Sequence, residues 1–299
     1  MAGHVYGGPH TDRDKLRRLQ AYLRAYSTAL KQSGFVLAYI DAFAGSGDRD
    51  VVQAAFPLLG DGETVERVVT VPGSARIAID TDPPLHRLIL IEKDRRRFAE
   101  LLQIKAQHPN RCIECRQGDA NDIVQEICST LPWRGPAAPG KGMRAVMFLD
   151  PYGMQVGWET LRAIARTEAV DLWYFFPLMG VYRQAARDLA AVDPDKRRAL
   201  TFLLGTEEWM TAWYPPAASH QASLFDPDES ATQFRTANVD ALEQFALERL
   251  RTIFRGGVLP PVRIYLAGGA PLASLFFAVS NPHPRASQLA KRIADHILG

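Results

Sequence analysis

The chain lacks most of the features that assign a protein to a structural class by composition alone. Three cysteines, Cys112, Cys115 and Cys128, are too few for a disulfide framework in 299 residues. No apolar run in the sequence reaches the ~20 residues that a helix needs to cross a bilayer. Residues 1–10 lack the charged and then apolar layout of a secretion signal. We therefore expect a cytoplasmic protein that has no membrane partner.

An excess of charge of one sign is also missing. The sequence has 35 Lys and Arg residues against 33 Asp and Glu residues, which gives a net charge of +2. The basic clusters at 95–97 and 196–198 are short and are typical of solvated helix faces. Composition therefore neither requires nor excludes a nucleic-acid partner.

The spacing of Cys112 and Cys115 suggests a metal site, but the surrounding pattern does not support one. The segment 111–117 is predicted to be extended, and residues three apart on a strand point to opposite faces of the sheet. The sequence has no second cysteine pair. We therefore expect no metal ion.

The rest of the chain is organised around the stretch 36–47, which reads V-L-A-Y-I-D-A-F-A-G-S-G. Its apolar first half, 36–40, has the length and composition of a strand buried on both faces. Asp41 and the turn 44–47 follow at once, and glycine permits both a sharp turn and the close approach of another molecule. A carboxylate before a Gly-x-Gly turn at the end of a central parallel strand is typical of nucleotide-type cofactor sites. Such turns also occur as plain strand ends.

Buried strands and amphipathic helices then alternate along the chain. Further strands are predicted at 88–91, 111–117, 145–149 and 170–176, with a closing hairpin at 262–267 and 275–280. Helices are predicted at 12–32, 74–79, 94–106, 123–131, 158–167, 239–254 and 289–298. This order predicts a single α/β domain over 1–299. Its sheet is doubly wound and mostly parallel, with seven strands and an antiparallel terminal hairpin.

Two segments interrupt this order. An inserted loop at 48–73 contains a short alternating run at 65–71 that fits a hairpin. A mainly helical insertion at 178–240 carries Trp209, Trp213 and Tyr214, which form either an exposed binding platform or the insertion's own core. Both segments leave from strand ends on the same side, so we expect them to lie over the carboxyl edge of the sheet.

Acidic residues follow four of the predicted strands, namely Asp41, Glu92, Asp119 and Asp150. One such residue can simply cap the following helix. Four at matching positions indicate a shared crevice at the carboxyl edge. The stretch 150–153, D-P-Y-G, also has the composition of a plain turn.

The order of these acids resembles the class I S-adenosylmethionine-dependent methyltransferases, which implies their Rossmann-like fold. A narrower resemblance is to the three-Cys-motif partner proteins (TcmP), a methyltransferase-like family named after a protein that it accompanies. It rests on D-A-F-A-G-S-G, G-S-A-R-I-A-I, I-E-K-D, G-D-A-N-D, F-L-D-P-Y-G and F-F-P-L-M-G in this order. It covers residues 10–185, and S-N-P-H-P near the end also fits. The resemblance implies a three-Cys-motif protein as partner.

The resemblance also implies a role for each motif. Asp41 and the backbone of 44–47 would face the methionine end of S-adenosylmethionine, Glu92 would hold both ribose hydroxyls, and Asp119 would contact the adenine. The cofactor-binding residues that it implies are Asp41, Phe43, Ala44, Gly45, Gly47, Glu92, Lys93, Asp119 and Ala120. The catalytic residues that it implies are Asp150, Pro151 and Tyr152, in the place of the D/N-P-P-Y motif of amino-methyltransferases. Only one proline is present and Gly153 follows the aromatic residue, so a nucleic-acid base as acceptor stays open.

Two functions are compatible with these residues. One is an S-adenosylmethionine-dependent N-methyltransferase that acts on an amine of a nucleic-acid base or another planar acceptor. The carboxylate of Glu92 can accept two hydroxyl hydrogen bonds, and methyl transfer from a sulfonium needs a positioned nucleophile in a dry site. The other is a methyltransferase-like binding subunit that acts with a partner protein and has little or no turnover of its own.

Overall fold

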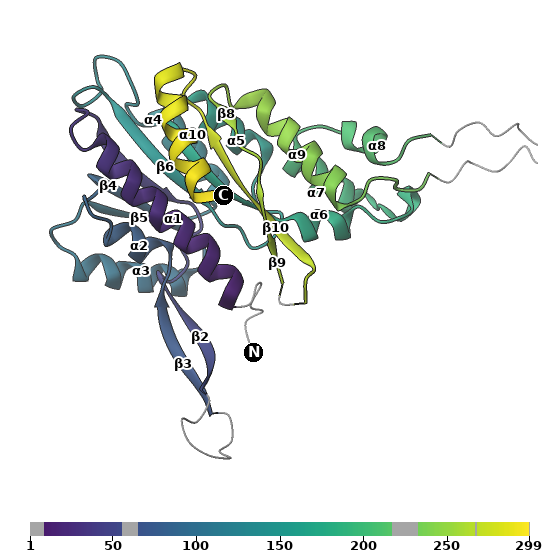
Figure 1. Cartoon of the computed structure of the whole chain (residues 1–299), viewed down its shortest axis with the longest axis horizontal. Coiled ribbons are helices and arrows are strands. Elements are labelled where there is room, and N and C mark those ends of the chain that lie inside the picture. The colour runs from purple at the N-terminus through teal and green to yellow at the C-terminus, as the bar shows by residue number, and fades with distance from the viewer. Residues whose placement is uncertain (1–8, 56–64, 217–232, 267, 299) are drawn as a thin grey trace, which may run out of the picture.

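The computed structural model describes residues 9–55, 65–216, 233–266 and 268–298, and its centre is one mixed sheet (Figure 1). In spatial order the strands are β5 (Ile113–Gln117), β4 (Arg87–Glu92), β1 (Val36–Asp41), β6 (Met143–Leu149), β7 (Val170–Phe176), β10 (Pro271–Val279) and β8 (Gly257–Val258), while β9 (Val262–Tyr265) also pairs with β10. The strands from β5 to β7 are parallel, and β10 is antiparallel to its neighbours.

Four of the five parallel strands, all except the edge strand β5, are mainly apolar because helices cover both faces of the sheet. In β1, β4, β6 and β7 all residues of each strand but one are buried. A strand that is covered on both faces has no solvent-facing positions and therefore needs no polar alternation. This explains why these strands stand out as continuous runs in the sequence.

The helices form one layer on each face of the sheet. One layer contains α1 (Pro9–Leu30), α2 (Ser74–Ile79), α3 (Arg95–Gln107) and α10 (Pro284–Leu298). The other contains α4 (Ala120–Thr130), α5 (Trp158–Arg166), α6 (Leu178–Gln184), α7 (Pro194–Leu204), α8 (Glu208–Trp213) and α9 (Val239–Ile253). α1 and α10 lie side by side across their face (Figure 1). None of the helices in the described part of the chain has both the length and the apolar character needed to span a bilayer.

The doubly wound α/β sheet predicted from the sequence is confirmed. Five parallel strands followed by an antiparallel hairpin form the Rossmann-like arrangement of the class I methyltransferase fold. The sheet has eight strands instead of the predicted seven, because its last edge strand is divided into β8 and β9. The division falls at Pro260 and Pro261, which have no N–H to donate to the ladder with β10.

α1, α4 and α10 begin earlier than predicted, at Pro9, Ala120 and Pro284. α2 begins at Ser74 as predicted, and its N-cap is Gly73. The Ser74 side chain is hydrogen-bonded to Asp41 instead of capping the helix. α10 begins at Pro284, five positions before the predicted start at Leu289. The fixed φ of proline suits the first turn of a helix, so this residue begins α10 instead of preceding it.

The inserted loop at 48–73 is a β-hairpin formed by β2 (Asp48–Ala55) and β3 (Val65–Pro72), and residues 56–64 lie outside the described ones. The hairpin leaves the sheet at its carboxyl edge, as predicted. It then extends away from the sheet instead of lying over that edge (Figure 1). The prediction that this segment covers the edge is therefore wrong.

The insertion at 178–240 is helical where it is described, with α6, the short helix η1 (Leu189–Ala191), α7 and α8, while residues 217–232 lie outside the described ones. Trp209, Trp213 and Tyr214 are at most 1% exposed, and Trp209 packs against the other two rings. These aromatics are part of the core. The alternative that they form an exposed binding platform is therefore wrong.

Candidate functional site

The four acidic residues lie along one edge of the sheet. Asp41 and Glu92 end β1 and β4, Asp150 directly follows β6, and Asp119 comes two positions after β5. β1 lies between β4 and β6 and is parallel to both. The carboxyl ends of all four strands therefore meet at the same edge, as the sequence predicted.

Asp41 is fully buried at the centre of this edge. Its carboxylate accepts hydrogen bonds from the Phe43 N–H (3.2 Å) and the Tyr39 hydroxyl (3.0 Å). Burial raises the pKa of Asp41 to about 6, although the hydrogen bonds from Ser74, Tyr39 and the Phe43 amide act in the opposite direction. The nearby Asp150 carboxylate adds to the rise. Asp41 is thus ionised at neutral pH and takes up a proton in mild acid.

We expect Asp41→Asn to change how stability depends on pH. The folded-state pKa of about 6 exceeds the value of about 3.9 in an unfolded chain, so the folded protein binds the extra proton between these values. The contribution of Asp41 to the free energy of unfolding therefore falls by about 3 kcal/mol as the pH rises from roughly 4 to 6. Because asparagine does not ionise, the variant should be more stable than the wild type at pH 8 and lose this advantage at pH 4.

Urea unfolding at both pH values measures this difference. Asp295 is an exposed aspartate on α10, and Asp295→Asn should leave the pH profile of stability unchanged. Parallel profiles for the wild type and Asp41→Asn would show that burial does not shift the pKa of Asp41.

Glu92 joins the ends of β4 and β1. Its Oε2 accepts a hydrogen bond from the Gly45 N–H (2.9 Å), and its Oε1 accepts one from the Asp94 N–H (2.8 Å). The residue is only 7% exposed. A carboxylate has about four acceptor positions, so two remain after these contacts. Glu92 therefore holds the glycine turn in place and keeps the capacity to accept hydroxyl hydrogens.

Gly45 and Gly47 serve different purposes in the turn. Both have positive φ angles, 61° and 83°. A Cβ atom at Gly47 would lie 2.3 Å from the Ile104 Cδ1, so glycine lets α3 pack against the turn. A Cβ atom at Gly45 would meet nothing within 4 Å. The backbone at Gly45 therefore faces open space beside Glu92, where a ligand can approach it closely.

Phe43 and Ala44 have packing roles between Asp41 and Gly45. Phe43 is partly buried against the core that lies on the face of α4 and α5. Ala44 is buried, and its N–H donates to the Ile91 carbonyl (2.9 Å). Ala44 fixes the turn to β4 and Phe43 packs against the core, whereas Gly45 faces open space.

Asp119 is the N-cap of α4, which matches the plainer interpretation of its position. Its Oδ1 accepts a hydrogen bond from the Asn121 N–H (2.9 Å), and Lys93 Nζ lies 3.1 Å from its Oδ2. Burial raises the pKa of Asp119, but the contacts with Lys93 and Asn121 outweigh this effect and lower it below the usual range. Ala120 is the first residue of α4 and is almost buried. The contact between Lys93, directly after β4, and Asp119, two positions after β5, therefore joins the carboxyl ends of these two strands.

Asn121 was not predicted as a site residue, although the structure gives it four side-chain contacts. Its Nδ2 donates to the Gln155 carbonyl (2.8 Å) and the Asp119 Oδ1 (3.1 Å). Its Oδ1 accepts from the Gly157 N–H and the Thr160 hydroxyl, both at 2.8 Å. Asn121 thus holds the loop after β6 against the start of α4. Its place in G-D-A-N-D, two positions after an acidic residue that can cap a helix, was the only signal in the sequence.

Asp150 forms an ion pair that the sequence analysis missed. Lys15 of α1 places its Nζ 2.8 Å from one carboxylate oxygen and 2.7 Å from the other, and the two side chains are 5% and 8% exposed. The Lys15 Nζ also lies 4.4 Å from the centre of the Phe175 ring of β7. Lys15 comes four residues before Leu19 on the apolar face of α1, and this position was the available signal.

Pro151 and Tyr152 continue from Asp150 towards the solvent. Pro151 is buried, whereas Tyr152 is 52% exposed. The Arg97 guanidinium of α3 lies 5.0 Å from the centre of the Tyr152 ring. This aromatic ring at the carboxyl edge offers an accessible face of the kind on which planar groups stack.

The cysteines do not come together in the structure. Cys112 is exposed, and Cys115 and Cys128 are partly buried free thiols. Within the described ranges, no three His, Cys, Asp or Glu side chains are grouped in a way that could hold a metal ion.

Comparison with known proteins gives similarity of fold at low sequence identity. No family model and no curated protein matches the chain. The crystal structure of protein LPL1258 from Legionella pneumophila, described with the family model DUF519, is 14% identical with a TM-score of 0.48, and the match covers 99% of this chain and 94% of that one. Aeropyrum pernix fibrillarin with natively bound S-adenosyl-L-methionine is 11% identical with a TM-score of 0.34, covering 87% and 76% of the two chains. M. jannaschii TYW2 in complex with AdoMet is 8% identical with a TM-score of 0.34, covering 90% and 74%. Sequence identities and TM-scores this low do not identify a substrate. The function must therefore be inferred from the residues at the carboxyl edge of the sheet.

Proposed function

We propose that this protein is an S-adenosylmethionine-dependent methyltransferase that methylates an amine on a planar acceptor such as a nucleic-acid base. The observation that carries the proposal is the contact between Glu92 and the glycine turn. A nearly buried carboxylate with acceptor capacity to spare lies directly beside the Gly45 backbone, which faces open space. The fully buried Asp41 lies two residues from this turn.

The residues at this edge fit the proposed cofactor. Glu92 would accept hydrogen bonds from both ribose hydroxyls with its two remaining acceptor positions. The Gly45 backbone and Asp41 would hold the methionine end, and Asp119 with Ala120 and Lys93 would lie against the adenine. The open space at Gly45 supports this arrangement, because a side chain there would occupy it.

The chain must also hold the acceptor. When bound, S-adenosylmethionine supplies an electrophilic methyl group on a sulfonium. The exposed ring of Tyr152 would stack against a planar acceptor, and Asp150 would orient the amine and stabilise the positive charge that develops on it. Pro151 would contribute its carbonyl oxygen as a second acceptor for the amine hydrogens. The nucleophile must be held in line and kept dry, and the buried position of Asp150 supports the second requirement.

Membership of the three-Cys-motif partner proteins is part of the same proposal. It rests on the order of the motifs along residues 10–185. The acidic and glycine residues of these motifs lie at one edge of the sheet, which supports it. A three-Cys-motif protein would then be a partner of this chain.

A second candidate function follows from the Lys15–Asp150 ion pair. Both oxygens of the carboxylate that would meet the acceptor already contact a lysine. This contact favours a binding subunit that holds the cofactor, docks on a partner and has little turnover of its own. The two functions differ in whether Asp150 is needed for a reaction.

An assay of S-adenosylhomocysteine release separates the two candidates. The purified chain is incubated with S-adenosylmethionine and a panel of single-stranded and double-stranded nucleic acids, peptides and small amines. We expect turnover with at least one acceptor that carries an amine on a planar ring. Binding of the cofactor at micromolar strength without release on any acceptor would favour the binding subunit, and no binding at all would refute both.

A further inference from the structure

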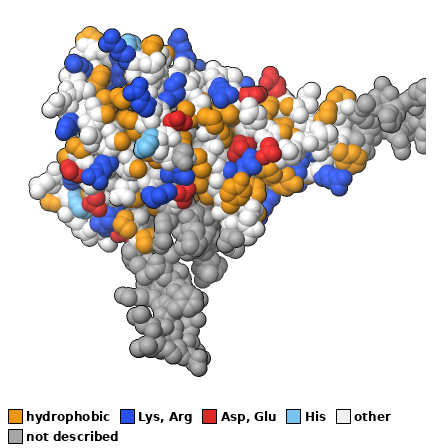
Figure 2. All heavy atoms as spheres, in the orientation of Figure 1, with side chains coloured by type: hydrophobic (Ala, Val, Ile, Leu, Met, Phe, Trp, Pro, Cys, Tyr) orange, Lys and Arg blue, Asp and Glu red, His pale blue; other side chains and the backbone are white. Residues whose placement is uncertain are grey.

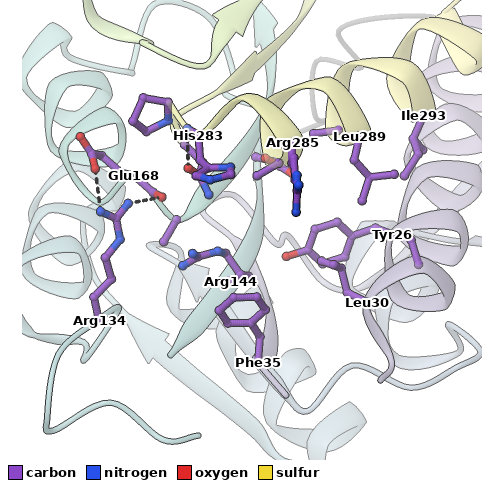
Figure 3. A pocket seen from close by; sticks show the side chains of 17 residues that line it. Tyr26, Leu30, Phe35, Arg134, Arg144, Glu168, His283, Arg285, Leu289 and Ile293 are labelled. Carbon is purple, nitrogen blue, oxygen red and sulfur yellow. Dashed lines mark hydrogen bonds and ion pairs between the residues drawn. The ribbon is translucent and has the colours of Figure 1, made fainter. Parts of the chain in front are cut away.

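A cavity of about 660 Å³ lies at the amino edge of the sheet, opposite the acidic residues. It opens between the end of α1 and the beginning of α10 (Figure 3). One side of it is apolar, with Leu30 from α1, Leu289 and Ile293 from α10, and Phe35 before β1. A volume of this size is typical of sites for small organic molecules, which occupy about 300–1,000 Å³.

The other side of the cavity carries an excess of cationic groups. Arg134, Arg144 and Arg285 line it, together with His283, and the acids among its lining residues are Glu168 and Asp171. In Figure 2 the charged side chains on the upper part of the visible face, over the amino edge of the sheet, are mainly Lys and Arg, interspersed with hydrophobic ones.

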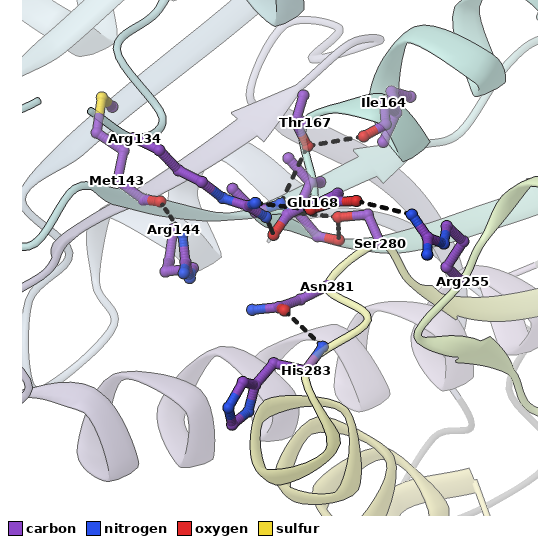
Figure 4. Close-up of polar contacts among 12 residues, drawn as sticks. Arg134, Met143, Arg144, Ile164, Thr167, Glu168, Arg255, Ser280, Asn281 and His283 are labelled. Carbon is purple, nitrogen blue, oxygen red and sulfur yellow. Dashed lines mark hydrogen bonds and ion pairs between the residues drawn. The ribbon is translucent and has the colours of Figure 1, made fainter.

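Both acids are already occupied by other groups. Arg134 donates to the Glu168 carboxylate (2.6 Å) and to the Glu168 carbonyl (2.5 Å), and Arg255 lies 3.4 Å from the other carboxylate oxygen (Figure 4). Asp171 is partly buried and accepts a hydrogen bond from the Tyr22 hydroxyl (2.8 Å). Burial raises the pKa of Asp171 to about 7, so this carboxyl carries only part of a negative charge near neutral pH.

Arg144 and Arg285 therefore keep their positive charge for another partner. Arg144 donates to the Met143 carbonyl (2.9 Å) and its guanidinium lies 4.4 Å from the Phe35 ring centre. In the described part of the chain, no ion pair joins Arg144 or Arg285 to a carboxylate. Burial lowers the pKa of Arg144 and the neighbouring Arg134 lowers it further, while Tyr26 and the Asp171 carboxyl act in the opposite direction. An anion placed here would relieve this repulsion.

The buried hydroxyl of Tyr26 is a second indication that a ligand binds in this cavity. Tyr26 is 4% exposed, and its hydroxyl has no hydrogen-bond partner among the described residues. A buried polar group without a partner is costly, and in native structures it often marks a ligand, a water or an ion that completes it. Figure 3 shows this hydroxyl directed towards Arg285, with Arg144 beside them. The amino end of α10, which carries a positive partial charge, begins at the same place.

We propose that this cavity binds a small organic anion with an apolar body. Its anionic group is held by Arg144, Arg285 and the Tyr26 hydroxyl, and its apolar body lies along Leu30, Leu289 and Ile293. The site is at the opposite edge of the sheet from Glu92, so its test does not depend on whether the proposed cofactor site binds S-adenosylmethionine.

Titration calorimetry on the purified full chain tests the charge requirement. Decanoate, decyl phosphate and 1-naphthoate serve as anions of different head group and body, while 1-decanol and decyltrimethylammonium share the apolar chain without the negative charge. We expect at least one anion to bind with one-to-one stoichiometry and the neutral and cationic molecules to bind at least about tenfold more weakly. Failure of all three anions, or equal binding of 1-decanol, would overturn the proposal.

Variants then locate the binding. Arg144→Gln and Arg285→Gln should each weaken the anion about tenfold or more, and Leu289→Glu should abolish its binding. Arg285 and Leu289 are exposed, so their variants keep the fold even if Arg144→Gln does not. Arg292 lies on α10 outside the cavity and is the control, because Arg292→Gln should bind as the wild type does. Unchanged binding in Arg285→Gln and Leu289→Glu would place the anion elsewhere and refute the site.

Discussion

Glu92→Ala is expected to weaken S-adenosylmethionine binding about ten- to hundredfold, from a wild-type affinity in the micromolar range. The variant loses a charged acceptor that would bind two ribose hydroxyls. It also loses the contact between Oε2 and the Gly45 N–H, which holds the turn that lies against the cofactor. Titration calorimetry with S-adenosylmethionine and S-adenosylhomocysteine measures the affinity of both proteins.

The control for this prediction is Glu100→Ala. Glu100 lies on α3, is half exposed, and is within ion-pair distance of Arg96, so its loss should leave cofactor affinity unchanged. Glu92→Ala also leaves two backbone N–H groups without their acceptor, at a cost of about 1–3 kcal/mol each if they stay buried. The titration is therefore made well below the melting temperature of the variant. Equal affinities of wild type and Glu92→Ala would remove Glu92 from the ribose role.

Asp150→Asn is expected to lower turnover about 10²- to 10³-fold, by analogy with the loss of one transition-state partner, while cofactor affinity hardly moves. The same substitution should also lower stability, and this effect must be distinguished from the loss of turnover. Removing one member of a buried ion pair costs about 3–5 kcal/mol, and both side chains here are almost inaccessible. Lys15→Met should therefore destabilise the protein as much as Asp150→Asn does.

The double variant Lys15→Met/Asp150→Asn distinguishes a structural role from a catalytic one. Because both charges of the pair are removed together, it should recover most of the lost stability. Its turnover should stay as low as that of Asp150→Asn if Asp150 acts on the acceptor. Urea unfolding and the release of S-adenosylhomocysteine are measured on the same four proteins. Recovery of turnover along with stability would mean that Asp150 supports only the fold.

The parts of the fold that the sequence predicts well are those in which one physical constraint dominates. The strand 170–176 is covered on both faces, so it is apolar except for Asp171, and its predicted limits coincide with those in the structure. The acids at the strand ends are also predictable, because parallel strands bring equivalent positions to one edge. The hairpin of β9 and β10 follows from two apolar runs around a glycine-rich turn.

The parts that could not be predicted depend on contacts between distant residues. Lys15 and Asp150 are 135 positions apart, and nothing local in either segment indicates the pair. The burial of Trp209 and Trp213 depends on helices that pack around them, such as α9. The role of Asn121 depends on Gln155, Gly157 and Thr160, which lie 34 to 39 positions later. In each case the residue type was visible in the sequence, and its partner was not.

The central claim is that a nucleotide-type cofactor binds at the carboxyl edge of the sheet, between the Gly45 turn and Glu92. A crystal structure of the chain with S-adenosylhomocysteine tests it most directly. We expect density for the ligand at that edge, with the ribose hydroxyls within hydrogen-bond distance of the Glu92 carboxylate and the backbone of Gly45 against the ligand. Density at the opposite edge, in the cavity lined by Arg144 and Arg285, or a saturated crystal without density beside Glu92, would contradict it.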